Sequence, residues 1–220
     1  MLFFWKHLGL VLLGGQHYLN SNMQDLLSCK KCPRIVNNLD KLRKIYPNYL
    51  NRPIIPIKRN ESSIAIVGLA PGLTGANRTG QIFNGDFSGD ILNKAIKLSG
   101  INFENKLLQP YITNAVKCYP PNNKPNISEI NNCNIFLKQE LESLNNLKVI
   151  IALGSISHNS ILQSYSLAKQ EYKFSHAYVH KINRNLVLID SYHCSKININ
   201  TKKLTLVMLI NILNLAVSNR

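Results

Sequence analysis

Residues 63–68 read SIAIVG, and residues 69–86, which follow directly, read LAPGLTGANRTGQIFNGD. The first stretch is short and almost wholly apolar, which predicts a buried β-strand. The second stretch is rich in glycine, so its backbone is able to lie close against a ligand. It lacks the Gly-Lys-Ser/Thr end of a P-loop and the Gly-x-Gly-x-x-Gly spacing of a dinucleotide-binding loop. We therefore expect a shaped pocket directly after the first strand, with a long surface loop as the simpler alternative.

Strand-like and helix-like stretches alternate along the rest of the chain. Further strands are expected at 111–116, 148–153 and 186–190, and helices at 88–99, 128–144, 155–167 and 201–217. We expect Ser88 and Ser128 to cap two of these helices. Residues 23–46 also have helical spacing, interrupted by Pro33, and 47–62 form an irregular connector. This order predicts an α/β fold with three α/β/α layers and a short, central, mainly parallel four-stranded sheet.

The length of 220 residues suits one domain, which we place at 23–220. We interpret residues 1–22 as an N-terminal extension whose native status is open, because Met23 is an alternative start. No apolar run reaches the roughly 18 residues of a membrane span, so we expect no membrane-spanning segment. The 26 basic residues exceed the 11 acidic ones by 15, which favours a polyanionic partner such as nucleic acid. A compositional bias toward Asn, Ile and Lys is the alternative explanation.

Five cysteines, an odd number without a secretory signal, argue against a disulfide framework. Cys29 and Cys32 form a Cys-x-x-Cys pair, whereas 14 residues separate Cys118 from Cys133. Four thiolates suit a zinc ion or an iron–sulfur cluster, and the wide second spacing favours a cluster that joins distant segments. Zinc and buried or redox-active thiols stay open on spacing alone.

Nine short motifs occur in a fixed order along residues 23–215. They are CKKCPR (29–34), GLAPG (68–72), NRTG (77–80), FNGDFSGD (83–90), TNAVKC (113–118), PPNNKP (120–125), Cys133, ALG (152–154) and HCS (193–195). In this order they resemble the iron–sulfur uracil-DNA glycosylases, and within that superfamily the type 5 (UDGb-like) branch. The resemblance implies the three-layer α/β fold and hydrolysis of the N-glycosidic bond of uracil in DNA, which leaves an abasic site. Other deaminated bases are further expected substrates.

The resemblance also implies roles for three side chains. Phe83 should stack on a base that is flipped out of the duplex, and Asn114 should read the edge of that base with its amide. His193 should donate a hydrogen bond to the uracil oxygen where negative charge develops. The backbone of the first glycine-rich motif should line the pocket, through Gly68, Ala70, Pro71 and Gly72. The structural alternatives are an ordinary core residue for Phe83, a strand-end cap for Asn114 and a turn residue for His193.

The residue that activates water is not found in the motif at 68–72. Related branches place an acid within the motif equivalent to 68–72, but Leu69 and Ala70 are unable to polarise water. Asp86 is therefore our candidate for orienting water or stabilising the cationic sugar. Its structural alternative is capping the helix that begins near Ser88.

The turn after the fourth expected strand departs from the family. Cys194 stands where the family usually has proline, so we expect a looser turn. We do not expect Cys194 to be a ligand of a cluster. Ser195 should bind a phosphate, Asn198 is a further substrate-binding candidate, and Ile197 should wedge into the space that the flipped nucleotide leaves. Basic residues beside the motifs are expected to contact the backbone of DNA: Lys30, Lys31, Arg34, Arg78, Lys117, Lys124, Lys196, Lys202 and Lys203.

By the same resemblance, Cys29, Cys32, Cys118 and Cys133 hold a 4Fe-4S cluster with a structural role. The expected partner is DNA that contains uracil or other deaminated bases, and the protein should be a cytoplasmic monomer. A non-catalytic iron–sulfur protein that binds nucleic acid is the main alternative. A zinc-stabilised hydrolase of nucleotides is the second alternative.

Overall fold

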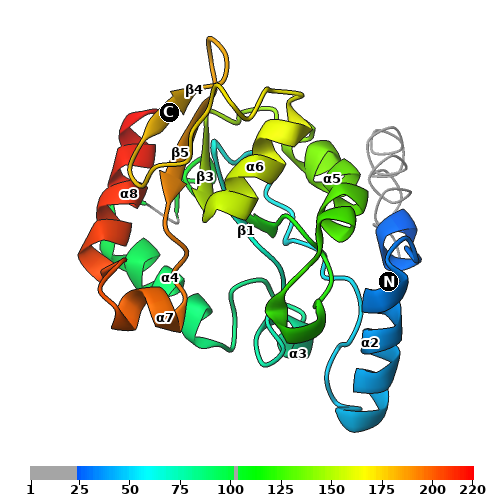
Figure 1. Cartoon of the computed structure of the whole chain (residues 1–220). Coiled ribbons are helices and arrows are strands. Elements are labelled where there is room, and N and C mark those ends of the chain that lie inside the picture. The colour runs from blue at the N-terminus through cyan, green and yellow to red at the C-terminus, as the bar shows by residue number, and fades with distance from the viewer. Residues whose placement is uncertain (1–23, 102–103) are drawn as a thin grey trace, which may run out of the picture.

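A five-stranded sheet of order β2-β1-β3-β5-β4 forms the centre of the computed structural model, which describes residues 24–101 and 104–220 (Figure 1). The expected extension 1–22 and Met23 lie outside the described residues. The strands are β1 (Ile64–Gly68), β2 (Tyr111–Asn114), β3 (Val149–Leu153), β4 (Val179–Lys181) and β5 (Val187–Ser191). β1 pairs in parallel with β2 and β3, and β3 with β5, whereas β4 pairs antiparallel with β5. The mainly parallel sheet is confirmed, and its fifth strand escaped prediction because β4 has three residues and no apolar run.

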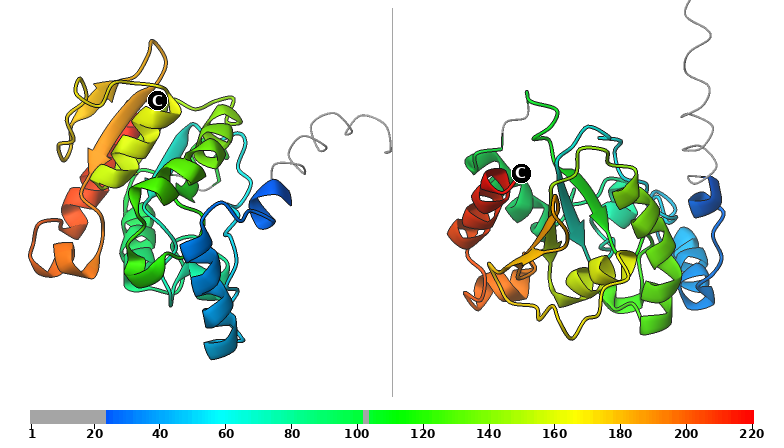
Figure 2. Two further views of the ribbon diagram at one scale, coloured as in Figure 1. Left: turned by 45° about the vertical axis from the view of Figure 1, so that its right-hand side comes forward. Right: turned by 90° about the horizontal axis from the view of Figure 1, so that it is seen from above.

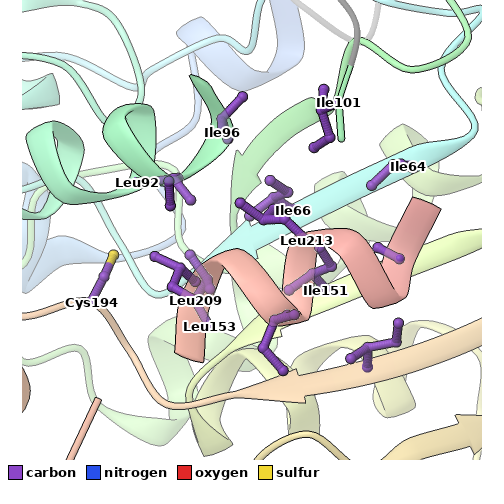
Figure 3. Packing of buried hydrophobic residues seen from close by; sticks show 14 of the residues in the cluster. Ile64, Ile66, Leu92, Ile96, Ile101, Ile151, Leu153, Cys194, Leu209 and Leu213 are labelled. Atoms are coloured by element: carbon purple, nitrogen blue, oxygen red, sulfur yellow. The ribbon is translucent and has the colours of Figure 1, made fainter. Parts of the chain in front are cut away.

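Helices cover both faces of the sheet, as Figure 2 shows. α4 (Phe87–Leu98) and α8 (Leu206–Ser218) lie on one face, and α5 (Ile127–Glu142) and α6 (Ser155–Ser164) on the other. Successive residues of a strand point to opposite faces of the sheet. Ile64 and Ile66 therefore belong to the first core, under α4 and α8, and Ala65 and Val67 to the second core, under α5 and α6. Figure 3 shows α8 packed across the first face of the sheet. The predicted three-layer architecture is therefore confirmed.

The start of α6 is as expected, whereas the caps of α4 and α5 lie two residues before the expected serines and α8 starts five residues late. Asp86, not Ser88, caps α4, and Asn126, not Ser128, caps α5 in a reciprocal capping box. Thr205 caps α8, which therefore begins at residue 206 instead of 201. In each case an extended residue with a side-chain oxygen reaches the N–H three positions later, so the serines lie inside the first helical turn.

The remaining helices are short or peripheral. α2 (Pro33–Ile45) begins at Pro33, which does not interrupt a helix but occupies its first turn, where no N–H is needed. α3 (Ala76–Thr79) and α7 (Lys196–Asn200) lie at the carboxyl end of the sheet, in the lower part of Figure 1. Both are too short to produce a helical pattern in the sequence. Within the described residues, no helix combines the length and apolarity needed to cross a membrane.

Candidate active site

A cavity of about 770 Å³ opens at the carboxyl edge of the sheet. Phe83 comes from the loop after β1, Asn114 from the end of β2 and His193 from the turn after β5, and all three line it. The structure therefore brings together the three side chains that the sequence predicted would converge. The full lining is Leu69–Thr74, Ala76, Phe83, Asp86–Ser88, Asn114, Tyr119, Asn123, His193 and Ser195–Ile197.

Phe83 is held in place by its backbone. Its φ of 53° lies in the left-handed region, which is strained for an aromatic residue and frequent at functional sites. Asn93 Nδ2 donates to the Phe83 carbonyl at 3.0 Å, and a Cβ at Gly89 would lie 2.5 Å from that carbonyl carbon. The ring is 7% exposed and belongs to the first core, so Phe83 is a core residue and a cavity residue at once.

Gly68 explains how Asn114 and Phe83 come so close. A Cβ at residue 68 would collide with Asn114 Oδ1 and lie 2.8 Å from the Phe83 ring. Gly68 itself is absent from the cavity lining, so it supports the pocket from behind instead of forming its wall. The other three predicted backbone positions, Ala70, Pro71 and Gly72, do line the cavity.

His193 faces the same space with a neutral ring. Its ring centroid lies 6.3 Å from that of Phe83, at an angle of 33°. Burial lowers the pKa of His193, and the nearby negative charge of Asp86 opposes this only in part. The imidazole is therefore uncharged at neutral pH and offers one N–H donor and one acceptor.

Asp86 uses its two oxygens differently. Oδ1 accepts the Gly89 N–H at 2.9 Å and so caps α4. Oδ2 lies against the first glycine-rich segment, where a Cβ at Gly72 would be 2.7 Å away and one at Gly75 would collide with it. Since Asp86 also lines the cavity, the capping role and a role toward ligand are compatible.

The turn that carries His193 is fastened at both ends, in contrast to the looseness expected without proline. Asn198 Nδ2 donates to the His193 carbonyl at 2.8 Å, so the Asn198 side chain holds the turn. Asn198 does not line the cavity, in contrast to the substrate-binding role expected of it. The Cys194 thiol donates to the Ser88 carbonyl at 3.4 Å, and burial raises its pKa to about 12. Ser195 caps α7 and borders the cavity, and Ile197 is 74% exposed at its rim.

Tyr119 and Asn123 also line the cavity but were not predicted to do so. Both follow β2 directly, in the stretch that contains the PPNNKP motif, and Asn123 has a φ of 57°. Their place after a strand end was the available signal.

The four predicted cysteine ligands lie in one neighbourhood. Cys29, Cys32 and Cys118 pack against the cluster of buried residues that contains Cys133. Burial is the main cause that raises the pKa of Cys118, and the nearness of the other three thiols adds to it. Burial also raises the pKa of Cys133 to about 11, while the Lys117 N–H donates to its sulfur at 3.3 Å. Cys194 belongs to a different core, on the other side of the sheet.

The spread of these thiols bears on what they hold. Within the described part of the chain, the group of ligating side chains compact enough to surround one ion is His158, His180 and Asp190, not the thiols. Four thiolates around a polynuclear cluster lie farther apart than four around a single zinc ion. The four described thiols therefore form a donor set that a polynuclear cluster is able to use.

The buried group His158, His180 and Asp190 lies apart from the cavity and was not predicted. His158 Nδ1 lies 2.7 Å from Asp190 Oδ1, and His180 Nε2 lies 2.9 Å from Asp190 Oδ2. His158 Nε2 faces the Tyr172 carbonyl at 2.9 Å, so both ring nitrogens of His158 face acceptors. Burial opposes the charged form, but the bonds to Asp190 and Tyr172 outweigh it and raise the pKa of His158. The group is a buried hydrogen-bonded network that joins α6, β4 and β5.

The predicted basic surface is only partly available. Lys117 is buried and paired with Glu140, so it is excluded from contact with DNA. Arg34 pairs with Glu129 at 2.6 Å, and Arg78 donates to two backbone carbonyls of its own loop. The other six predicted residues are exposed: Lys30, Lys31, Lys124, Lys196, Lys202 and Lys203.

Comparison with known proteins agrees with this geometry. Residues 57–215 match the family described as the Uracil DNA glycosylase superfamily. A type-5 uracil-DNA glycosylase of Pyrobaculum aerophilum is 34% identical over 208 residues, which cover 88% of this chain and 90% of the relative. One of Thermus thermophilus is 32% identical over 204 residues, 87% of this chain and 93% of the relative. One of Mycobacterium leprae is 31% identical over 216 residues, 90% of this chain and 94% of the relative.

Proposed function

Because the chain belongs to the uracil-DNA glycosylase superfamily, we propose that it removes uracil from DNA by hydrolysing the N-glycosidic bond and leaves an abasic site. The observation that carries this proposal is the convergence of an aromatic ring, an amide and a neutral imidazole on one cavity. This combination suits an extruded base, which needs a stacking surface, a reader for its edge and a donor for its oxygen.

Base recognition falls to Phe83 and Asn114. The Phe83 ring offers a fixed apolar face, because strain and packing leave its backbone little freedom. The Asn114 amide both donates and accepts, which matches the alternating groups on the edge of uracil. The cavity of about 770 Å³ has room for an extruded base together with its sugar.

Cleavage creates a uracil anion and a cationic sugar. The neutral His193 forms an N–H hydrogen bond to the uracil oxygen and stabilises the negative charge that develops there. The imidazole keeps its proton throughout. Water adds to the sugar carbon that the base leaves, and Asp86 orients that water and accepts its proton. The Asp86 carboxylate suits this step because Leu69 and Ala70, which line the same cavity, offer no acid.

We also propose that Cys29, Cys32, Cys118 and Cys133 hold a 4Fe-4S cluster. The support is their shared neighbourhood and the resemblance of their motifs to the iron–sulfur branch of the superfamily. When bound, the cluster supplies a cross-link and no step of the reaction. The cysteines connect the start of α2, the segment after β2 and α5, so this link fastens the N-terminal part of the domain to the sheet.

The partner that we propose is DNA carrying uracil or another deaminated base. The exposed lysines supply phosphate contacts, and Lys196 borders the cavity itself. None of the five described cysteines forms a disulfide, which suits the reducing conditions of the cytoplasm.

Release of free base from a labelled oligonucleotide tests the function directly. We expect the purified protein to liberate uracil and to leave a site that alkali cleaves. A panel with uracil, hypoxanthine and thymine in otherwise identical DNA measures the range of bases. Binding that weakens steeply with salt, without release of any base, would favour the non-catalytic alternative.

A further inference from the structure

A buried lysine lies between the cavity and the four thiols. Lys117 follows β2, and its side chain has no exposed surface. Its ammonium lies 2.6 Å from Glu140 Oε2, 2.7 Å from Thr113 Oγ1 and 2.7 Å from the Asn114 carbonyl oxygen. An ammonium has three N–H donors, so each of them has an acceptor. A buried charge is costly unless it is paired in this way, and the contacts are therefore specific.

The first consequence concerns Asn114, the proposed reader of the base. β2 is an edge strand, so Asn114 has a neighbouring strand only on the side of β1, where it pairs with Gly68. The Lys117 ammonium gives the Asn114 carbonyl a second attachment. The adjacent Thr113 hydroxyl donates to Glu140 Oε2 at 2.7 Å and strengthens the same connection. The peptide that carries the reading amide is thus fixed at a point where an edge strand would otherwise be free to move.

The second consequence concerns the thiols. The backbone N–H of Lys117 donates to Cys133 Sγ, and Cys118 is the next residue. Glu140 lies on α5 seven residues after Cys133, which is two helical turns and therefore the same face of the helix. One residue thus contacts a thiol through its backbone and the base-reading peptide through its side chain.

We propose that Lys117 is a positioning residue that, together with Glu140, fastens Asn114 to the thiol-bearing helix α5. The proposal rests on the proposed function, in which the Asn114 amide reads the extruded base. The ammonium fixes the direction of that amide, and the thiol site thereby becomes part of the mechanical support of the pocket. Removal of the ammonium misplaces the amide and slows cleavage. Affinity for DNA changes little, because phosphate contacts on the surface supply it.

A double-mutant cycle with Asn114 tests this role. Lys117→Met/Glu140→Gln removes the charge and leaves no orphaned carboxylate, and single-turnover uracil release is measured with and without Asn114→Ala. If Lys117 acts through Asn114, the pair of substitutions slows release roughly 10- to 100-fold in the first background. In the Asn114→Ala background, the same pair should change the rate less than about twofold. The KM for DNA should stay within about threefold in both backgrounds.

The other ion pair of α5 offers a matched control. Glu129 pairs with Arg34, which lies beside Cys32 at the start of α2, so this pair joins α5 to the thiol region. Arg34→Met/Glu129→Gln should lower thermal stability or the retained visible absorbance of the cluster. It should leave the rate of uracil release unchanged in the loaded protein.

Three results would overturn the inference. These are an unchanged rate in Lys117→Met/Glu140→Gln, an equal slowing with and without the Asn114 amide, and the same slowing by the Arg34 control pair. Absence of uracil release by the unaltered protein would instead overturn the proposed function, and this inference with it. Should the double variant fail to fold, Lys117→Met alone removes the ammonium, leaves Glu140 with the Thr113 hydroxyl as donor, and enters the same cycle under the same criterion.

Discussion

At the level of single residues, Asp86 links the fold to the reaction. One oxygen caps α4, and the other lies beside the glycine-rich loop at the cavity. The glycines at 72 and 75 are required there, because any side chain would occupy the position of that oxygen. The two alternatives drawn from the sequence, a helix cap and a group that acts on water, thus describe two atoms of the same carboxylate.

Two substitutions at this position separate the two tasks. Asp86→Asn keeps a good capping oxygen, so we expect unchanged thermal stability but uracil release slowed about 100-fold or more. Asp86→Ala should show the same loss of activity and, in addition, lose about 1 kcal/mol of unfolding free energy. Full activity in Asp86→Asn would leave the carboxylate with its capping role alone.

His193 provides a second prediction at this scale. His193→Ala removes the donor to the developing anion, so the single-turnover rate should fall about 100- to 1000-fold. Affinity for DNA should stay nearly the same, because the side chain faces the cavity and not the basic surface. Quenched-flow or gel measurement of base release, with binding measured separately, checks both parts. An equal rate in the variant would remove His193 from the mechanism.

The sequence indicated the side chains that contact the base better than the residues that hold those side chains in place. The resemblance pointed to Phe83, Asn114 and His193, and the segments that carry them meet because parallel strands end at one edge of the sheet. Asn198 and Lys117 were misplaced because a turn and a buried ion pair decide where their side chains point. Gly68 was taken as a wall and is a spacer, which only the distances to Asn114 and Phe83 reveal.

Among the elements, α6 is joined to β5 by the contact between His158 and Asp190. Asp190 lies three residues before His193. The raised pKa of His158 means that its contribution to stability is complete below about pH 6.5, where the unfolded chain is also protonated. That contribution disappears as the pH rises through the folded pKa. His193 and His176 have lowered pKa values and act in the opposite direction, because they oppose folding at acid pH.

Comparison with His158→Gln isolates this contribution. The variant keeps a hydrogen-bond donor toward Asp190 but no charge, and the effects of His193 and His176 cancel in the difference. We expect the wild-type advantage in unfolding free energy to be largest below pH 6.5 and to narrow toward pH 9. Urea denaturation across this range measures it, and an advantage that does not vary with pH would show that folding leaves the pKa of His158 unshifted.

The elements themselves were predictable in kind but not in their boundaries. Apolar runs identified β1, β3 and β5, and three-layer order followed from their alternation with helices. The caps of α4 and α5 were assigned two residues late, because serine and the correct Asp86 or Asn126 are all good capping residues. Backbone conformation at the boundary decides among them, and the sequence does not contain it directly.

At the scale of the whole molecule, the four thiols and Cys194 divide into two classes. Cys118→Ser should abolish the brown colour and visible absorbance and should lower the thermal unfolding midpoint by several degrees or more. Cys194→Ala is the control, because Cys194 is a buried cysteine that belongs to the other core. It should keep the colour. Loss of colour in the control, or its retention in Cys118→Ser, would contradict the proposed ligand set.

The proposed function depends most on the cavity, where an extruded base is expected to bind. The most direct measurement is a crystal structure with an oligonucleotide that carries 2′-fluoro-deoxyuridine, in which the glycosidic bond resists hydrolysis. The uracil should lie flat against Phe83, with its edge on the Asn114 amide and an oxygen within hydrogen-bond distance of His193. A uracil that stays stacked in the duplex, or that binds away from these three side chains, would contradict the account.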